Sequence, residues 1–115
     1  MSKLVTCFAV TVLLSGCGGT RTYDVVDVTK AETIVLKKAS GQGPVHSLSV
    51  TGSGEIQGDA EISLILNGGQ YKTEKMSGKV DFRWGGDWYS DHAEIRYTPT
   101  SVTGGSLKLN YEFND

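Results

Sequence analysis

The sequence predicts an all-β domain, an antiparallel β-sandwich of about seven to eight short strands, with a small β-barrel as the alternative. Three observations favour this class. From Tyr23 onward apolar residues recur with a period of two. β-Branched and aromatic residues are frequent, and glycine-containing segments break the pattern at short intervals. No stretch shows a convincing helical period.

The predicted strands lie at residues 23–29, 32–38, 45–51, 60–67, 70–75, 78–84, 93–98 and 106–113. The clearest alternation is in the fourth. Ile62, Leu64 and Leu66 are predicted to point to one face, and Glu61 and Ser63 to the other. The strand at 70–75 is polar, and its lysines are typical of a sheet edge. Residues 52–59 indicate either a turn or a short bulged strand.

The breaks between strands have recognisable chemistry. In residues 39–44 the glycines allow positive φ, and Pro44 cannot donate to a central ladder. The NGG at 67–69 indicates a tight hairpin, because Asn-Gly tolerates the backbone of a primed turn. Pro99 and the TGG at 103–105 are expected to separate the last two strands.

The first residues have the order of a secretion signal. A basic Lys3 precedes an apolar run of eleven residues at 4–14. As a helix, this run would reach only about 17 Å, too short for a hydrocarbon core of about 30 Å. The segment is therefore predicted to be a signal peptide rather than a permanent membrane span.

Residues 14–17 (LSGC) follow this run, and the tetrapeptide resembles the lipobox of bacterial lipoproteins. The resemblance covers residues 1–17. It implies that the Cys17 thiol receives a diacylglyceryl group, that the signal is then cut just before Cys17, and that the new amino terminus is acylated. Two or more acyl chains anchor a protein stably in a lipid bilayer, whereas one binds only marginally. The residue after the cysteine is Gly18 rather than an aspartate, which resembles the sequence of lipoproteins sorted to the outer membrane. The expected location is therefore the periplasmic or surface face of that membrane. A plain secreted protein with an incidental cysteine is the alternative.

The expected organisation is a signal peptide at 1–16, a lipidated cysteine with a short tether at 17–22, and one β-sandwich domain at 23–115. Removing residues 1–16 from 115 leaves 99 residues, an ordinary domain size. Cys7 is the only other cysteine and lies in the signal, so no disulfide can form within the mature domain.

The charge of the mature chain argues against nucleic acid as a partner. Lys3 is one of 11 basic residues, so 10 remain against 13 acidic ones, a formal charge of −3. No basic stripe is present to neutralise phosphates. No sequence motif indicates a cofactor.

The candidate functional cluster is FRWGGDWYSDH at 82–92, where two tryptophans surround a Gly-Gly break. If Gly85 and Gly86 turn the chain, the tryptophans lie across a hairpin with the acidic residues at its end. The candidate ligand- or partner-binding residues are Trp84, Asp87, Trp88, Tyr89, Asp91 and His92.

Three interpretations of this cluster remain open. Trp84 and Trp88 can pack in the core and at the open end of the sandwich, while the aspartates solvate a turn. Exposed Trp88 and Tyr89 can instead form an aromatic platform for a sugar or a protein. A hard cation held by Asp87, Asp91 and Glu94 is a third possibility, although no metal site is expected.

The function expected from these features is a membrane-anchored envelope lipoprotein that binds an envelope protein or a cell-wall glycan without catalysis. Alternatives are an inhibitor or exclusion lipoprotein acting on a hydrolase or incoming agent, and a structural subunit of an envelope assembly. A small glycan hydrolase using Asp87 and Asp91 as its carboxylate pair is a further alternative.

Overall fold

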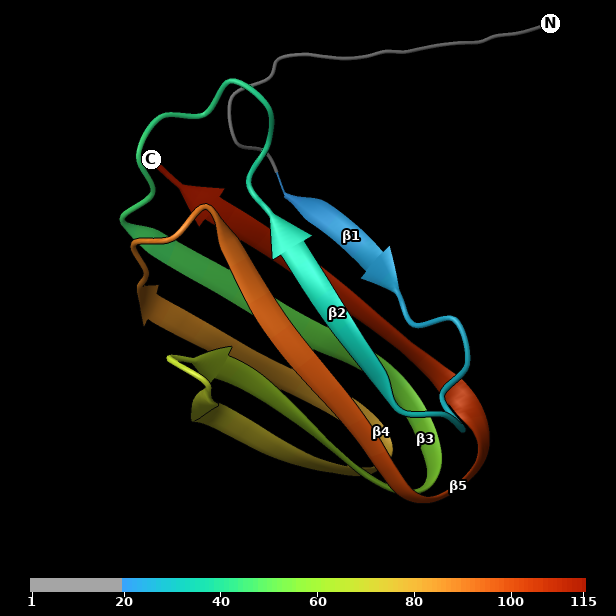
Figure 1. Ribbon diagram of the computed structural model, residues 1–115. Coiled ribbons are helices and arrows are strands. Elements are labelled where there is room, and N and C mark those ends of the chain that lie inside the picture. Colours follow the sequence, from blue (N-terminus) through green and yellow to red (C-terminus); the bar gives the residue numbers. More distant parts are fainter. Residues whose placement is uncertain (1–19) are drawn as a thin grey trace, which may run out of the picture.

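The computed structural model describes residues 20–115, and every regular element in that part of the chain is a β-strand. The strands form one antiparallel sheet in the order β1-β5-β3-β4, with β2 also paired to β5 (Figure 1). They are β1 Arg21–Asp24, β2 Glu32–Lys37, β3 Ser47–Leu66, β4 Gly69–Asp87 and β5 His92–Asn114. No membrane-spanning helix is present among these residues. The predicted all-β class is confirmed.

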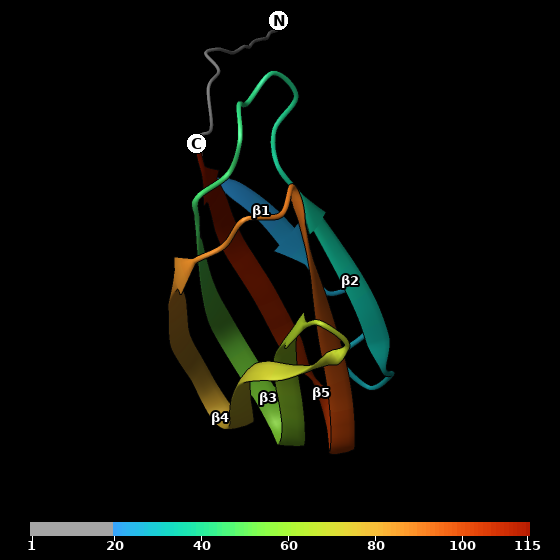
Figure 2. The ribbon, with the colours of Figure 1, turned by 60° about the vertical axis from the view of Figure 1, so that its left-hand side comes forward.

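Three strands are long, and each bends near its middle. β3, β4 and β5 contain 20, 19 and 23 residues. The register of β3 shifts between Ile56 and Asp59 against β4, and between Gln57 and Ala60 against β5. Beyond this level the strands return across their own first halves, so the sheet folds over itself into two layers (Figures 1 and 2). The smallest extent of the molecule is 19 Å, as expected for two layers about 10 Å apart.

The predicted count of seven to eight short strands in a two-sheet sandwich is not confirmed. The predicted strands at 45–51 and 60–67 are two halves of β3, and those at 70–75 and 78–84 are two halves of β4. Likewise, Pro99 and the TGG at 103–105 lie within β5 rather than between strands. The bulges at the bend keep the ladders paired where the sequence pattern indicates a break.

The core lies between the two layers of the folded sheet. Inward side chains of both strand halves contribute to it, because alternate residues of a strand point to the same face. Its most deeply buried members are Val50, Ile56, Ile62, Leu36, Ala93, Ile95, Tyr97, Leu107, Leu109 and Phe113. The core therefore depends on the bend that brings the two halves face to face.

Gly58 shows why the bend needs glycine. Its φ is +129°, a value that L side chains rarely adopt. A Cβ at this position would also collide with the backbone carbonyl oxygen of Ser101 in β5. Only a residue without a side chain lets β3 and β5 approach this closely.

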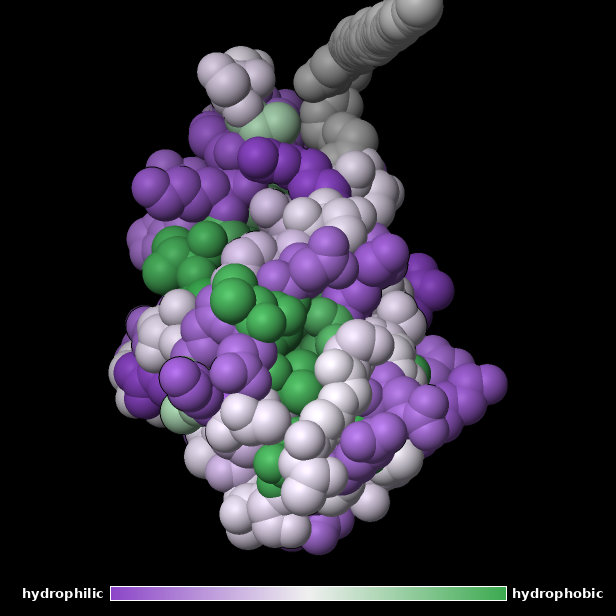
Figure 3. Space-filling model, turned by 90° about the vertical axis from the view of Figure 1, so that its right-hand side faces the viewer, coloured by the Kyte–Doolittle hydropathy of each residue, from purple (hydrophilic) through white to green (hydrophobic). Residues whose placement is uncertain are grey.

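β1 and β2 are the edges of the two layers on one side of the molecule. Side chains, rather than a backbone ladder, connect them: Arg21 Nη1 donates to the carbonyl of Lys37 at 3.0 Å, and the Tyr23 hydroxyl donates to Glu32. The bond to the Glu32 carboxylate raises the pKa of Tyr23 to about 12. Figure 3 looks onto this side, where hydrophobic surface lies between hydrophilic side chains. We call this boundary the β1–β2 seam.

Residues 38–46 form a strap at the end of the molecule where the described chain begins (Figure 2). Gln42 is 8% exposed, and its amide donates to the carbonyl of Phe113 at 2.6 Å and accepts from the Ala39 N–H at 2.8 Å. The Gly43 N–H donates to Asp115 at 2.7 Å, and this bond is the main reason that the pKa of Asp115 is lowered. The strap is thus fixed to the end of β5.

We expect Gly58→Ala to destabilise the domain by about 3 kcal/mol, since it adds both backbone strain and a collision with Ser101. Gly69→Ala is the matched control, because its φ is ordinary and its Cβ would meet only the Leu66 carbonyl oxygen at 4.0 Å. That change should stay within about 0.5 kcal/mol. Urea unfolding of the chain without residues 1–16 measures both. Equal effects of the two changes would contradict the account of the bend.

Candidate functional site

The structure divides the six predicted site residues into a buried pair and an exposed group. Trp84 and Trp88 are each 6% exposed, whereas the Tyr89 side chain is 76% exposed. Asp87, Asp91 and His92 are also exposed. An exposed Trp88–Tyr89 platform is therefore absent, because only Tyr89 reaches solvent. Cys17, the predicted lipidation site, lies outside the described residues.

The Gly85–Gly86 pair does not turn the chain as the sequence suggested. Both glycines lie inside β4, where they pair with Ser49 and Leu48 of β3. The turn comes later, between the end of β4 at Asp87 and the start of β5 at His92. The aromatic residues are consequently placed along one strand and its following loop, rather than across a hairpin.

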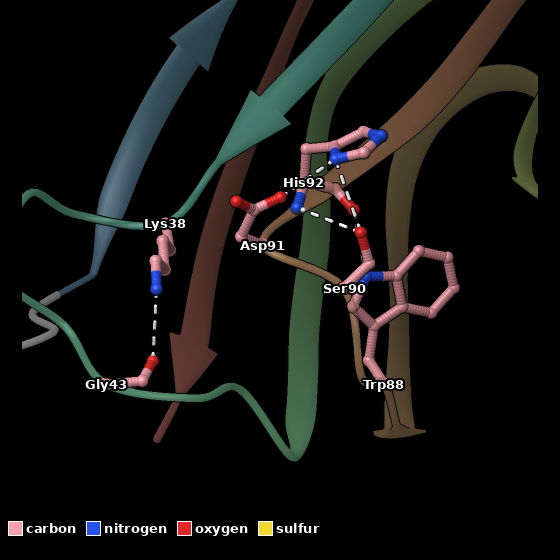
Figure 4. Close-up of polar contacts among 6 residues, drawn as sticks. All are labelled: Lys38, Gly43, Trp88, Ser90, Asp91 and His92. Carbon is pink, nitrogen blue, oxygen red and sulfur yellow. Dashed lines mark hydrogen bonds and ion pairs between the residues drawn. The ribbon is translucent and has the colours of Figure 1, made fainter.

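Trp88 holds this loop against the sheet. Its backbone N–H donates to the carbonyl of His46 at 3.2 Å, and its indole Nε1 donates to the carbonyl of His92 at 3.0 Å (Figure 4). A buried indole is stabilised when its single donor is satisfied in this way. Trp84 packs beside Phe82 with ring centroids 4.8 Å apart. Both tryptophans therefore have structural roles that position the exposed residues next to them.

Ser90, Asp91 and His92 form a small polar group on this loop (Figure 4). Both the Asp91 carboxylate, at 3.0 Å, and the Ser90 hydroxyl, at 3.2 Å, contact the same ring atom, His92 Nδ1. The hydrogen bond from His92 is the main cause of a lowered pKa at Asp91, with smaller contributions from the charges of His92 and Lys38. In a Ser-His-Asp triad the serine and aspartate contact opposite ring nitrogens, so this arrangement differs from one.

The described residues do not bring a metal-binding set together. No group of three His, Cys, Asp or Glu side chains in residues 20–115 is placed to hold a metal ion. Asp87, Asp91 and Glu94, considered from sequence as cation ligands, therefore do not form such a group. Glu94 instead accepts a bond from Arg96 Nε at 2.6 Å.

A narrow apolar cavity opens between the two halves of β4, beside the cluster. It measures about 10 Å³, room for about one water molecule. Apolar side chains from both layers line it, and we call it the β4 slot. Its lining comprises Leu48, Val50, Leu64, Tyr71, Lys72, Trp84, Gly85, Gly86, Asp87 and Trp88.

Tyr71 and Lys72 at the mouth of this slot were not predicted as site residues. Leu64 pairs with Lys72 and Ile65 with Gln70, so Tyr71 is the extra residue of a β-bulge. The bulge directs Tyr71 toward Trp88, with ring centroids 6.5 Å apart, and Lys72 Nζ lies 5.1 Å from the Tyr71 ring centre. The sequence contained only a polar edge-strand pattern here, which indicates neither the bulge nor its neighbour Trp88.

A scan against protein-family models finds no match, and a search of the curated proteins finds no significant relative. The chemistry available to the site is therefore that of its own residues. These combine an exposed tyrosine, exposed carboxylates and a slot that admits only the tip of a side chain.

We expect Trp88→Ala and Tyr89→Ala to have opposite consequences for stability. Trp88→Ala removes a buried ring and leaves a cavity, at a cost of about 3–5 kcal/mol. Tyr89→Ala removes an exposed ring and should change the free energy of unfolding by no more than about 0.5 kcal/mol. Urea unfolding followed by circular dichroism compares them. A large loss in the Tyr89 variant would mean that this ring is packed in solution.

Proposed function

We propose that this protein is a lipid-anchored lipoprotein of the bacterial cell envelope, with a non-enzymatic binding or accessory role toward another envelope component. The observation that carries the proposal is the LSGC tetrapeptide at 14–17, directly before the β-domain. Acylation of Cys17 would hold the protein at the periplasmic or surface face of the outer membrane, the location expected from Gly18.

The short distance between the anchor and the domain supports this role. Three Cα–Cα steps separate Cys17 from Thr20, so the two residues are at most about 11 Å apart. β1 begins at Arg21, inside the segment 17–22 expected to be tether. The end of the domain that carries the strap would therefore lie close to the bilayer.

The β4 slot itself is too small to enclose a small-molecule ligand. Small-molecule sites usually enclose about 300–1,000 Å³, far more than the 10 Å³ of this cavity. Tyr89 and Asp87 beside it offer an aromatic face and a hydrogen-bond acceptor to a larger partner. In this proposal the two halves of the folded sheet enclose one core, as the two sheets of a β-sandwich do. This core would hold the exposed residues at the end of β4 in fixed positions for a partner.

We expect Cys17→Ser to abolish both lipid attachment and membrane association. Cys7→Ser is the matched control, because it changes the only other cysteine, within the predicted signal. Palmitate labelling and membrane fractionation of cells expressing each full-length variant measure the two properties. Lipid labelling that persists in Cys17→Ser would contradict the proposed anchor.

The binding role predicts that the protein purified in mild detergent captures a defined envelope component. Tyr89→Ala should weaken the capture about tenfold, as expected for an exposed aromatic contact. Val26→Ala is the control, because Val26 is 86% exposed but lies in the loop after β1, away from the cluster. Capture that is equally strong with both variants would exclude Tyr89 from the binding surface.

A further inference from the structure

Within residues 20–115, β4 pairs only with β3, so its other backbone edge has no strand partner in this part of the chain. The Trp88 N–H donates to the carbonyl of His46, which extends the β3–β4 ladder by one pair. Residues of an antiparallel strand alternate in the direction of their backbone groups. Trp84 and Gly86 therefore direct N–H and C=O toward β3. The same groups of Arg83, Gly85 and Asp87 face the free edge.

Other edges of the described sheet carry features that discourage pairing. β1 and β2 contain only 4 and 6 residues, and side-chain bonds connect them across the β1–β2 seam. The first half of β4 has the bulge at Tyr71 and carries Lys72 and Lys75. In contrast, residues 83–87 stay in continuous register with β3. This stretch is consequently the least protected part of the β4 edge.

The two glycines of this stretch are not required by the packing of the domain. A Cβ at Gly85 would have nothing within 4 Å, and its φ is outside the left-handed range. Gly86 also has open space around it and lines the β4 slot next to Trp84, but its φ of +149° by itself favours glycine, so only Gly85 is unexplained by the domain. Glycine inside a strand often marks a place where another backbone approaches closely. Because side chains of a strand point to the faces of the sheet, the open space at Gly85 leaves room for the side chain of a residue paired opposite it on an added strand.

We propose that residues 83–87 accept an extended segment of a partner polypeptide as an added strand, with the tip of one small apolar side chain of that segment at the β4 slot. Free N–H and C=O groups repeating along a strand are matched by another extended backbone, and an apolar pocket beside them selects a side chain. Arg83 and Asp87 place opposite charges at the two ends of the stretch. The inference rests on the proposed binding function and narrows its partner to an envelope protein instead of a glycan.

The test is site-specific photocrosslinking in cells that produce the full-length protein, with a benzophenone amino acid at Asp81, an exposed position beside the stretch. We expect an adduct with a polypeptide, and mass spectrometry then gives the crosslinked segment. Gly85→Pro removes an outward N–H and should lower the adduct yield about tenfold, the effect of one lost hydrogen bond. Gly85→Ala keeps the N–H, fills only open space and should retain the adduct.

Circular dichroism of each variant shows whether the fold is kept, and Arg83→Pro removes a neighbouring outward N–H if Gly85→Pro disturbs it. A second measurement needs no variant: a synthetic peptide copying the crosslinked segment should shift the amide signals of Arg83, Gly85 and Asp87. Absence of these shifts would overturn the proposal.

Three crosslinking results would also overturn it: no adduct, an adduct with a glycan or a second copy of this chain, or an undiminished adduct in folded Gly85→Pro. If the Tyr89 experiment captures a component while crosslinking at Asp81 fails, the edge proposal is wrong and the binding function stands. If nothing is captured at all, the proposed function itself fails.

Discussion

Close backbone contact at the bend is the constraint on which the rest of this structure depends. Three glycines at that level, Gly54, Gly58 and Gly105, have positive φ, and a Cβ on any of them would collide with a carbonyl oxygen of the neighbouring strand. Because β3, β4 and β5 bend together, one sheet supplies both walls of the core. Apolar residues of both strand halves then lose their contact with water, which is the main favourable contribution to folding.

Sequence periodicity predicted the local features well, because they depend on neighbouring residues. Asn67 and Gly68, with φ values of 53° and 80°, form the expected turn between β3 and β4. Ile62 and Leu64 are buried, as their alternation indicates. Leu66, predicted on the same face, is instead 42% exposed beside the turn, and Ser63, predicted outward, is buried. The strand expected at 23–29 is shorter, because Asp27 accepts bonds from the N–H and hydroxyl of Thr29 and closes a local turn.

Two features depend on contacts between residues that are distant in the sequence: the continuity of the long strands, and which residues come together at the site. Local sequence patterns do not reveal such contacts. Glycine and proline indicate breaks, yet here they occupy bulges and edge positions where the ladder continues. The same ambiguity explains why Gly85 and Gly86 were expected to form a turn. Trp88 could be assigned to neither the core nor the surface, since its burial requires Tyr71 of the bulged edge to lie beside it.

If the proposed lipid anchor at Cys17 holds the protein at a membrane, β1 has a mechanical consequence. It contributes only four residue pairs with β5, and it is the first strand after Thr20. A force applied through the anchor would load this ladder pair by pair, beginning at Arg21 and Tyr111. The side-chain bonds of Arg21 and Tyr23 to β2 would carry part of that load into the second layer. The bonds of the β1–β2 seam would thus reduce the force that the short β1–β5 ladder has to bear alone.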